Sequence, residues 1–291
     1  MANTILTPAI IAREALMVLR NNAVMARLVH RDYSSEFVGG VGDTITIRKP
    51  ATFVANEFNG TITVQDATES RVEVKMDKHL DVSFAVTAKQ MTMDIKDFSA
   101  QLLVPAMQAF ADKVDKYLLA LESEVTNRHS HTTGVIAPAD MIAARKFLTE
   151  KAAPLADRRF VMGATAEADL LGSDLFTNAD KVGDNGTALR EASLGRKFGM
   201  DCYVDQNITK SDNYTPSIAF HKNAMALVTR SLALPQGAAN AAIVDYDGFA
   251  LRVVYGYDIK TKTDTVSIDM LCGVKMLNKD LAAVIEDKRT A

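Results

Sequence analysis

The stretch from Arg71 to Val86, RVEVKMDKHLDVSFAV, constrains the fold more than any other part of the sequence. Seven of its eight even-numbered positions are apolar, and seven of its eight odd-numbered positions are polar or charged. This period of two predicts a β-strand with one apolar face. A continuous strand of this length would span about 50 Å, whereas strands usually have about five or six residues. We therefore expect the strand to lie on a surface beyond its own domain.

Composition argues against several classes of protein. The chain has 291 residues, of which 48% are hydrophobic and 24% charged, so it can bury an extensive core. Its 33 basic and 36 acidic residues give a net charge of −3, which argues against a dedicated nucleic-acid-binding protein. The two cysteines, Cys202 and Cys272, lie far apart and predict buried free thiols in a reducing compartment.

The sequence does not predict membrane insertion or secretion. No apolar run approaches the roughly 20 residues that a membrane span needs, so we expect no membrane segment. The opening residues, MANTILTPAIIAREALMVLR, contain no basic residue before Arg13, so they do not predict a signal peptide. We therefore expect synthesis in the cytoplasm.

The first predicted element is a helix that begins near Thr7 and Pro8, a capping residue followed by a proline that suits the first helical position. Apolar residues cover most of its circumference, including Ile11 and Val18. Such a helix must be covered by other protein. Its own domain or a neighbouring chain could provide that cover, and the sequence favours neither.

Residues 51–86 predict an extended two-stranded arm. A short strand over Thr44–Ile47 precedes it, and Asn59-Gly60 signals a turn within a polar stretch. An isolated hairpin is only marginally stable in water, and a long apolar edge favours pairing with another chain. We therefore expect the apolar face of the arm to pack on a neighbouring subunit. The expected contact residues are Val72, Val74, Lys75, Met76 and Lys78 of the arm, together with Ile11 and Val18 of the first helix.

The rest of the chain predicts helices and strands that alternate. Apolar residues recur every three or four positions over about residues 95–125, which predicts a helix about 45 Å long that Pro105 should bend. Residues 138–235 predict a small α/β unit. Two alternating runs, 249–255 and 266–276, predict a hairpin packed by one face on the long helix. The segment NKDLAAVI predicts a short closing helix.

No combination of residues predicts a catalytic, cofactor-binding or metal-binding site. His129 and His131 form the only close histidine pair, and no third ligand has a suitable spacing. Asp245–Gly248 resembles the middle of a calcium loop but lacks the glutamate needed near its end. Gly195–Gly199 is basic and could meet a phosphate, although a turn explains it without a ligand. No motif of hydrolases, zinc proteases or redox proteins is present.

The order of the segments resembles the major capsid proteins of tailed phages, in the coat-protein branch of short-tailed phages that assemble with a separate scaffolding protein. The resemblance covers nearly the whole chain. It is carried by GDTITIRKP, LDVSFAVTAKQMTMDIKDFSAQLLVPAMQAFADKVDKYLLAL, DRRFVMGATAEADLL, ALREASLGRKFGMDCYVDQNI and IDMLCGVKMLNKDLAAVI. It implies an α+β fold of the Hong Kong 97 type and a structural protein rather than an enzyme.

The resemblance also implies how the chain is divided. The implied parts are an N-terminal arm (1–36), a strand and extended loop (37–86), the spine helix of a peripheral domain (87–130), an α/β axial domain (131–240), and the C-terminal strands and helix of the peripheral domain (241–291). Some members of the family carry a large inserted domain, for which this chain has no room. Others cross-link through a Lys–Asn bond, and no partner can be matched here to Lys75 or Lys78.

The implied function is self-assembly, as pentamers and hexamers, into an icosahedral head shell that encloses double-stranded DNA without sequence-specific binding. Implied partners are a scaffolding protein, a portal protein and a decoration protein, and the implied location is the virion after synthesis in the host cytoplasm. Two alternatives remain open. One is an encapsulin-like nanocompartment shell that encloses a cargo enzyme, and the other is an α/β enzyme with a dimerisation arm, which would form a small fixed oligomer.

Overall fold

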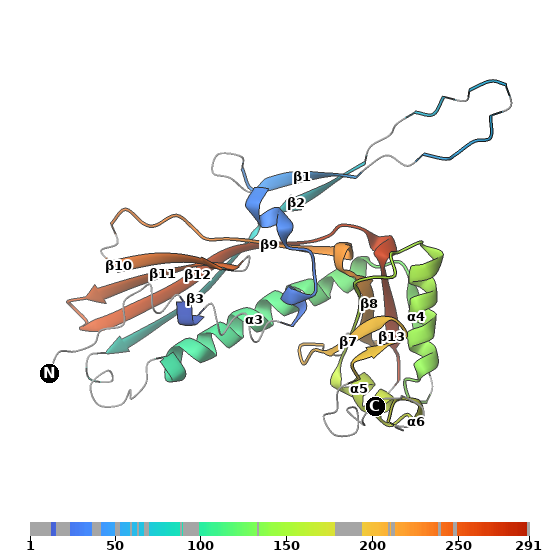
Figure 1. Ribbon diagram of the computed structural model, residues 1–291. Coiled ribbons are helices and arrows are strands. Elements are labelled where there is room, and N and C mark those ends of the chain that lie inside the picture. Colours follow the sequence, from blue (N-terminus) through green and yellow to red (C-terminus); the bar gives the residue numbers. More distant parts are fainter. Residues whose placement is uncertain are drawn as a thin grey trace.

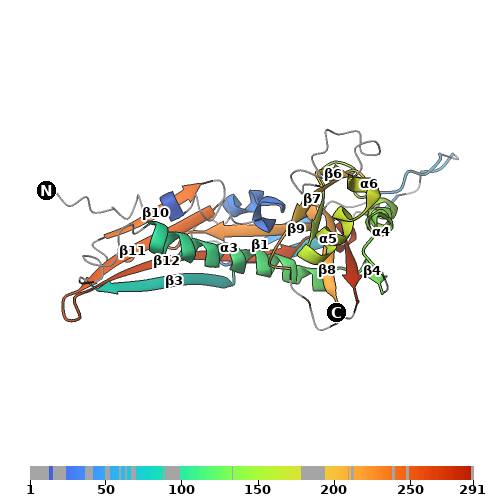
Figure 2. The ribbon, with the colours of Figure 1, turned by 90° about the horizontal axis from the view of Figure 1, so that it is seen from below.

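The computed structural model is an elongated molecule with two lobes and a projecting arm (Figure 1). In one lobe, the spine lobe, helix α3 (Val104–Leu119) runs along one face of a sheet, and the other lobe is a smaller α/β unit (Figure 2). The structure describes residues 13–15, 24–36, 42–49, 53–58, 60–62, 64–66, 70–87, 89, 99–132, 134–177, 194–208, 210, 213–237, 240–246 and 249–289.

The spine lobe contains an antiparallel sheet with the order β10-β11-β12-β3, and β9 also pairs with β12. Its strands are β3 (Lys78–Thr87), β9 (Met225–Arg230), β10 (Asn240–Tyr246), β11 (Phe249–Asp258) and β12 (Thr263–Met276). The predicted hairpin of two alternating C-terminal runs is therefore confirmed as β11 and β12. Val253, Val266 and Ile268 of these strands belong to the core that α3 also enters.

Helix α3 buries one side of its surface against the sheet. Phe110, Val114 and Leu118 recur at four-residue steps and are buried in the same core. The helical path extends beyond α3 through a π-helical turn, η3 (Ser99–Leu103), and a 3-10 turn, η4 (Ala120–Glu124). Pro105 lies in the first turn of α3, directly after η3, where its missing N–H coincides with the change in hydrogen-bond pattern.

The alternating run 71–86 is not one strand, which corrects the first prediction. β2 (Ser70–Lys75) pairs with β1 (Thr44–Lys49) in a separate two-stranded sheet, while β3 pairs with β12. The chain passes from one sheet to the other between Lys75 and Lys78. Gly273 of β12 makes this crossing possible, because a Cβ at that position would lie 2.2 Å from the carbonyl oxygen of Lys75.

The surface under β3 belongs to the same chain. Leu80 is buried in the core of the spine lobe, and Val82 and Phe84 pack against that core. The odd-numbered residues of β3 are exposed. The alternation therefore correctly predicts one buried face, but the expectation that a neighbouring subunit covers this half of the run is wrong.

The α/β lobe is built on a six-stranded sheet with the order β4-β13-β8-β5-β7-β6. Its strands are β4 (Arg128–His131), β5 (Arg158–Met162), β6 (Arg196–Lys197), β7 (Met200–Val204), β8 (Thr215–His221) and β13 (Ala282–Asp287). Its helices are α4 (Pro138–Glu150), α5 (Ala164–Leu171) and α6 (Asp174–Thr177). Met141 and Leu148 of α4 share a buried core with Phe160 of β5.

The segment NKDLAAVI is not a helix, which corrects another prediction. It contains a single 3-10 turn, η6 (Lys279–Leu281), and the first four residues of β13. Every residue of β13 is buried, because the strand lies inside the sheet between β4 and β8. β13 therefore pairs within the α/β lobe, although the sequence assigned it to the peripheral domain (241–291). Conversely, β9 pairs in the spine lobe, although the sequence assigned it to the axial domain (131–240).

Candidate assembly surfaces

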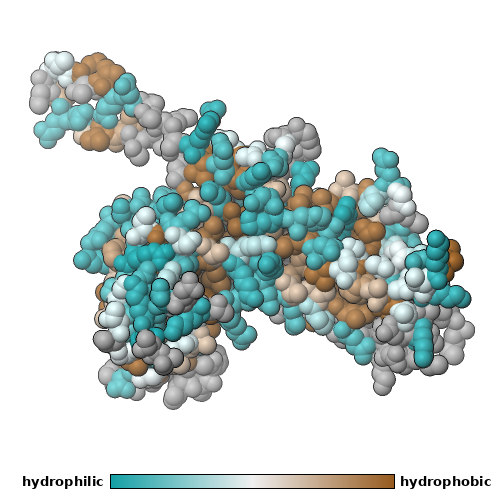
Figure 3. Space-filling view, turned by 180° about the vertical axis from the view of Figure 1, so that it is seen from behind, coloured by the Kyte–Doolittle hydropathy of each residue, from teal (hydrophilic) through white to brown (hydrophobic). Residues whose placement is uncertain are grey.

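The projecting arm consists of β1, β2 and the described residues between them, and its outer part extends away from both lobes (Figure 1). We call residues 53–58, 60–62 and 64–66 the arm tip. Phe58 is 71% exposed, Ile62 76% and Val64 84%. Figure 3 shows hydrophobic side chains on this isolated extension. Apolar side chains clustered on a projecting segment indicate a surface that another molecule covers.

The two sides of the arm tip are tied together by one side chain. The Gln65 amide accepts a hydrogen bond from the Val54 N–H at 2.9 Å and donates one to the Val54 carbonyl oxygen at 2.5 Å. The apolar residues of the arm tip are not among the contact residues predicted from the sequence. Their signal was present, because Phe58 and Ile62 flank the Asn-Gly turn within an otherwise polar stretch.

The base of the arm is fixed to its own chain. Val74, which is 0% exposed, and Met76 form a small hydrophobic cluster with Ala226 and Val228 of β9 and with Leu277. Val72 packs against the same cluster. The prediction that Val72, Val74 and Met76 present a free apolar face to a neighbour is therefore wrong, because β9 already covers that face.

The two lysines named with them make local ion pairs. Lys75 Nζ lies 3.4 Å from Asp43 Oδ2, and both side chains are exposed. Lys78 Nζ lies 2.8 Å from Asp77 Oδ1 and 5.3 Å from the ring centroid of Tyr117. The hydrogen bond from Lys78 lowers the pKa of Asp77. Lys75 and Lys78 both stay predicted contact residues. Ile11 and Val18 lie outside the described residues.

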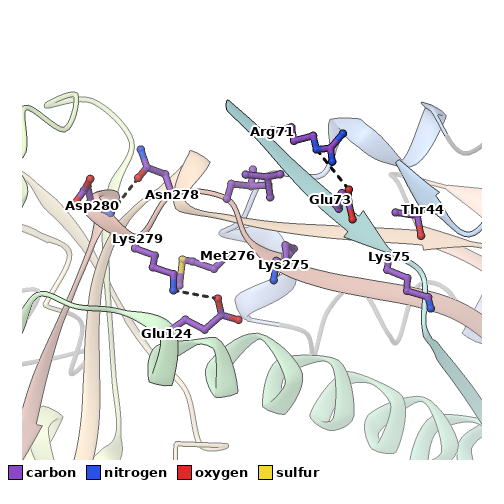
Figure 4. Close-up of a pocket in the computed structure, with 12 residues that line it drawn as sticks. Thr44, Arg71, Glu73, Lys75, Glu124, Lys275, Met276, Asn278, Lys279 and Asp280 are labelled. Carbon is purple, nitrogen blue, oxygen red and sulfur yellow. Dashed lines mark hydrogen bonds and ion pairs between the residues drawn. The ribbon is translucent and has the colours of Figure 1, made fainter. Parts of the chain in front are cut away.

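A polar groove of about 930 Å³ separates the base of the arm from the end of β12 and η6 (Figure 4). Lys279 Nζ lies 3.9 Å from Glu124 Oε2, and Arg71 Nε lies 3.8 Å from Glu73 Oε1. Exposed pairs of this kind contribute about 0–1 kcal/mol each. The groove therefore offers mixed charges rather than a site for one kind of ligand.

A charged network joins the end of the spine helix to the α/β lobe. Arg128 Nη1 donates to Glu286 Oε1 at 2.7 Å, and Arg128 Nη2 donates to Glu122 Oε2 at 3.1 Å. Burial raises the pKa of Glu286, but Lys288, Arg128 and Ser130 outweigh it and lower that pKa to about 2. Glu286 is therefore ionised over most of the pH range and holds β13 and β4 beside η4.

The histidine pair is part of a helix cap. His129 Nε2 lies 2.9 Å from Asp140 Oδ1, and His131 Nδ1 lies 3.2 Å from Asp140 Oδ2. Asp140 also accepts the Ala137 N–H at 2.8 Å at the start of α4. Burial raises the pKa of Asp140, but these hydrogen bonds outweigh it and lower the pKa. In the part of the chain that the structure describes, no group of three or more His, Cys, Asp or Glu residues is placed to hold a metal ion.

The other segments considered for chemistry have structural roles or lie partly outside the described chain. Gly195–Gly199 forms the tight turn of the β6–β7 hairpin, with both glycines at positive φ. Asp247 and Gly248 of the calcium-loop candidate are not among the described residues. Burial raises the pKa of Cys202 to about 11 and that of Cys272 to about 12, so both free thiols are poor nucleophiles. Among the described helices, none has the length and hydropathy to cross a membrane.

Comparisons with known proteins rest on structure alone. No protein-family model matches the sequence, and no curated protein matches it. A chain of the structure of Mycobacterium phage Che8 aligns with a TM-score of 0.69 and 20% identity, covering 90% of each chain.

Two capsid structures and one virus-like particle match as well. A chain of the capsid of the cyanophage P-SCSP1u aligns with a TM-score of 0.60 at 14% identity, covering 86% of this chain and 84% of that one. A chain of the mature capsid of bacteriophage PhiM1 aligns with a TM-score of 0.61 at 11% identity, covering 86% of this chain and 83% of that one. A chain of a virus-like particle from Pyrococcus furiosus aligns with a TM-score of 0.55 at 12% identity, covering 95% of this chain and 97% of that one. The chain therefore has the α+β fold of phage capsid subunits.

Proposed function

We propose that this chain is the major capsid protein of a tailed phage and assembles into the icosahedral head shell around double-stranded DNA. The observation that carries the proposal is the shared fold, which spans more than four fifths of chains from phage capsids. A projecting arm with an exposed apolar tip supports it independently, because exposed apolar side chains gathered on a projecting segment indicate a surface that another molecule covers. Many copies of the chain in one shell supply that surface.

In the proposed shell, the arm tip packs on a neighbouring subunit, and the base of the arm stays on its own subunit. Burying a large apolar side chain contributes about 1.5–3 kcal/mol. Phe58, Ile62 and Val64 expose most of their area in the free chain, so each can contribute much of that amount to a contact. Repetition of one modest contact around a closed shell makes assembly strong without a strong individual interface.

The proposed role requires structure rather than catalysis. The net charge of −3 suits a container whose wall does not bind DNA tightly. The proposed partners are further copies of the chain as pentamers and hexamers, a scaffolding protein, a portal protein, a decoration protein and the packaged DNA. The proposed location is the virion, after synthesis in the host cytoplasm. The proposed divisions of the chain are the N-terminal arm, the extended loop, the spine helix, the axial domain and the C-terminal strands of the peripheral domain, with β9 in the spine lobe and β13 in the α/β lobe.

One specific observation favours a second candidate function. The virus-like particle from Pyrococcus furiosus covers 95% of this chain, more than the two capsid structures described above. A closed shell other than a phage head is therefore the alternative, and the candidate is the encapsulin-like compartment that the sequence left open. The Pyrococcus furiosus particle aligns with a TM-score of 0.55, which is lower than the 0.69 of the Che8 chain. This difference favours the phage shell. An enzyme with a dimerisation arm has no comparable support.

Expression of the full chain with and without its candidate scaffold, followed by sedimentation and negative-stain electron microscopy, tests the proposal. Closed particles of uniform size support a shell protein. Phage packaging genes beside the coding sequence and DNA in particles from lysates favour the head shell, whereas a co-purifying enzyme favours the compartment. A dimer or tetramer as the end state under all assembly conditions would exclude both shells.

A further inference from the structure

One short segment near the N-terminus contacts both lobes and the base of the arm. We call residues 24–34 the strap, and Figure 1 shows it running from the base of the arm to α3. It contains η1 (Met25–Arg27) and the first part of η2 (Asp32–Glu36). Met25 and Ala26 are 0% exposed, and Val29 is 1% exposed. The strap is therefore part of the core and not a surface extension.

The inner end of the strap lies between the spine helix and the α/β lobe. The Val24 N–H donates to Asp115 Oδ2 of α3 at 3.0 Å. Arg159 of β5 donates to the carbonyl oxygen of Leu28. Met25 and Leu28 belong to a buried core that both lobes share, formed with Phe110, Val114 and Leu118 of α3 and with Val161, Ile218, Phe220 and Val284 of the α/β sheet. Strap residues therefore fill part of the space between the two lobes.

The α/β sheet depends on the strap for part of the cover of one face. Phe160 and Met162 of β5 belong to the core that they share with α4, whereas Val161 between them belongs to the core shared by both lobes. Successive residues of a strand point to opposite faces of a sheet. Helix α4 therefore covers one face, and α3 together with the strap covers the other.

The outer end of the strap pairs with β9 of the spine lobe. The His30 N–H donates to the Met225 carbonyl oxygen at 3.0 Å, and the Leu227 N–H donates to the His30 carbonyl oxygen at 2.9 Å. The Thr229 N–H donates to Ser34 Oγ at 3.2 Å. These bonds involve every second residue of β9, so the strap follows the edge of that strand.

The same end of the strap reaches the base of the arm. The rings of His30 and Tyr33 stack with their centroids 4.5 Å apart. Tyr33 packs against the small cluster that contains Val74 and Met76 at the base of the arm. His30 follows Leu28 by two positions, so the contacts with the arm and with the α/β lobe lie on neighbouring parts of one short chain.

We propose that the strap opens as a single unit and, while seated, couples the position of the arm to the angle between the two lobes. Local opening of a folded protein occurs in contiguous cooperative units. Because the strap is short, freeing Leu28 from Arg159 also frees the chain that holds His30 on β9. Opening withdraws apolar side chains from between the lobes, so their angle can then change. A partner that displaces the arm acts on this joint through Tyr33.

Hydrogen exchange of the full-length subunit, read by mass spectrometry, tests the strap directly. Peptides covering 24–29 report the inner end, those covering 30–34 and 225–230 report the outer end, and residues 252–258 of β11 are the reference. Arg159→Leu removes the donor to Leu28 and keeps an apolar side chain. Arg196→Leu is the matched control, because Arg196 is an exposed arginine of the same sheet and its ion pair is with Asp201, at 3.8 Å.

The expected result with Arg159→Leu is faster exchange at both ends of the strap by the same factor, about tenfold, because the lost hydrogen bond comes from a charged donor. The reference residues keep their rate, and Arg196→Leu leaves all peptides unchanged. Tyr33→Ala removes the contact with the base of the arm, so it should accelerate exchange in 24–29 in the same way, and it carries the test if Arg159→Leu does not fold. Faster exchange only at the substituted end, or an equal rise in the reference residues, overturns the inference.

The strap is a property of the subunit, and only its role in a shell rests on the proposed function. Engagement of the arm tip by a neighbouring subunit should slow exchange of the strap in particles relative to free subunits. A strap that opens as one unit in a chain that forms no shells retains the inference and removes the proposed function. Shells built from a chain whose strap ends open independently remove the inference and retain the proposed function.

Discussion

Replacing Phe58 and Ile62 together by serine should abolish shell assembly and leave the subunit folded. The two side chains are 71% and 76% exposed in the free chain, so the subunit gains little from them. Full burial of such a side chain contributes about 1.5–3 kcal/mol, and about three quarters of it remains available to a neighbour. The pair therefore contributes about 2–4 kcal/mol per contact, and a loss of about 3 kcal/mol weakens each contact roughly 150-fold.

The assay compares thermal melting of the subunits with the yield of particles on a sucrose gradient. The serine variant should melt within a few degrees of the wild type, because exposed substitutions change stability by about 0.5 kcal/mol or less. Phe58→Leu with Ile62→Leu is the matched control, since it keeps both positions apolar and should assemble. Val74→Asp provides the contrast, because Val74 is 0% exposed and its substitution should damage the subunit itself.

Two results would refute this reasoning. Shells that form from the serine variant at the wild-type concentration would mean that the arm tip contributes nothing to assembly. A serine variant that unfolds would mean that Phe58 and Ile62 stabilise their own subunit. In either case, the exposed apolar tip would need another explanation.

Three further predictions concern the subunit. Gly273→Ala should lower the melting temperature, at a cost of about 1–3 kcal/mol, because its Cβ would lie 2.2 Å from the carbonyl oxygen of Lys75; an unchanged melt would mean that the strand crossing is loose. Val114→Asp should unfold the subunit, because an unpaired carboxylate buried in that core costs several kcal/mol. Circular dichroism measures the loss of structure, and a native spectrum would contradict this prediction. Glu286→Gln should remove about 1 kcal/mol of the stability that the wild type has above pH 4.5 and loses as the pH falls towards 2, measured by urea unfolding at pH 3 and pH 7; equal losses at both pH values refute it.

Local patterns predicted which faces are buried better than they predicted what covers them. The alternation in residues 78–87 correctly indicates a strand with one apolar face. Its division from β2 depends on the close approach of Gly273, which lies almost 200 residues later in the chain. The hydrophobicity of AAVIED, the sequence of β13, is compatible with either a helix or a buried strand. It forms a strand because it pairs with β4 on one side and β8 on the other.

The contact surface was only partly predictable for the same reason. The sequence predicts that the chain around Asn59-Gly60 packs on a partner surface, which stays a prediction, but the contacts were assigned to the regular alternation at Val72, Val74 and Met76. Regular alternation marks a face that a sheet buries, and here β9 covers it. The irregular apolar residues Phe58 and Ile62 remain exposed. A buried carboxylate such as Asp115 has no sequence signal, since tertiary packing alone buries it.

The most direct test of the account is an electron cryomicroscopy reconstruction of the particles that the full chain forms. The account predicts a closed icosahedral shell in which the arm tip of each subunit packs on a neighbouring subunit while Val74 and Met76 stay against β9 of their own subunit. A small oligomer without a shell, or a shell in which the arm tip is in contact with its own subunit alone, would contradict it.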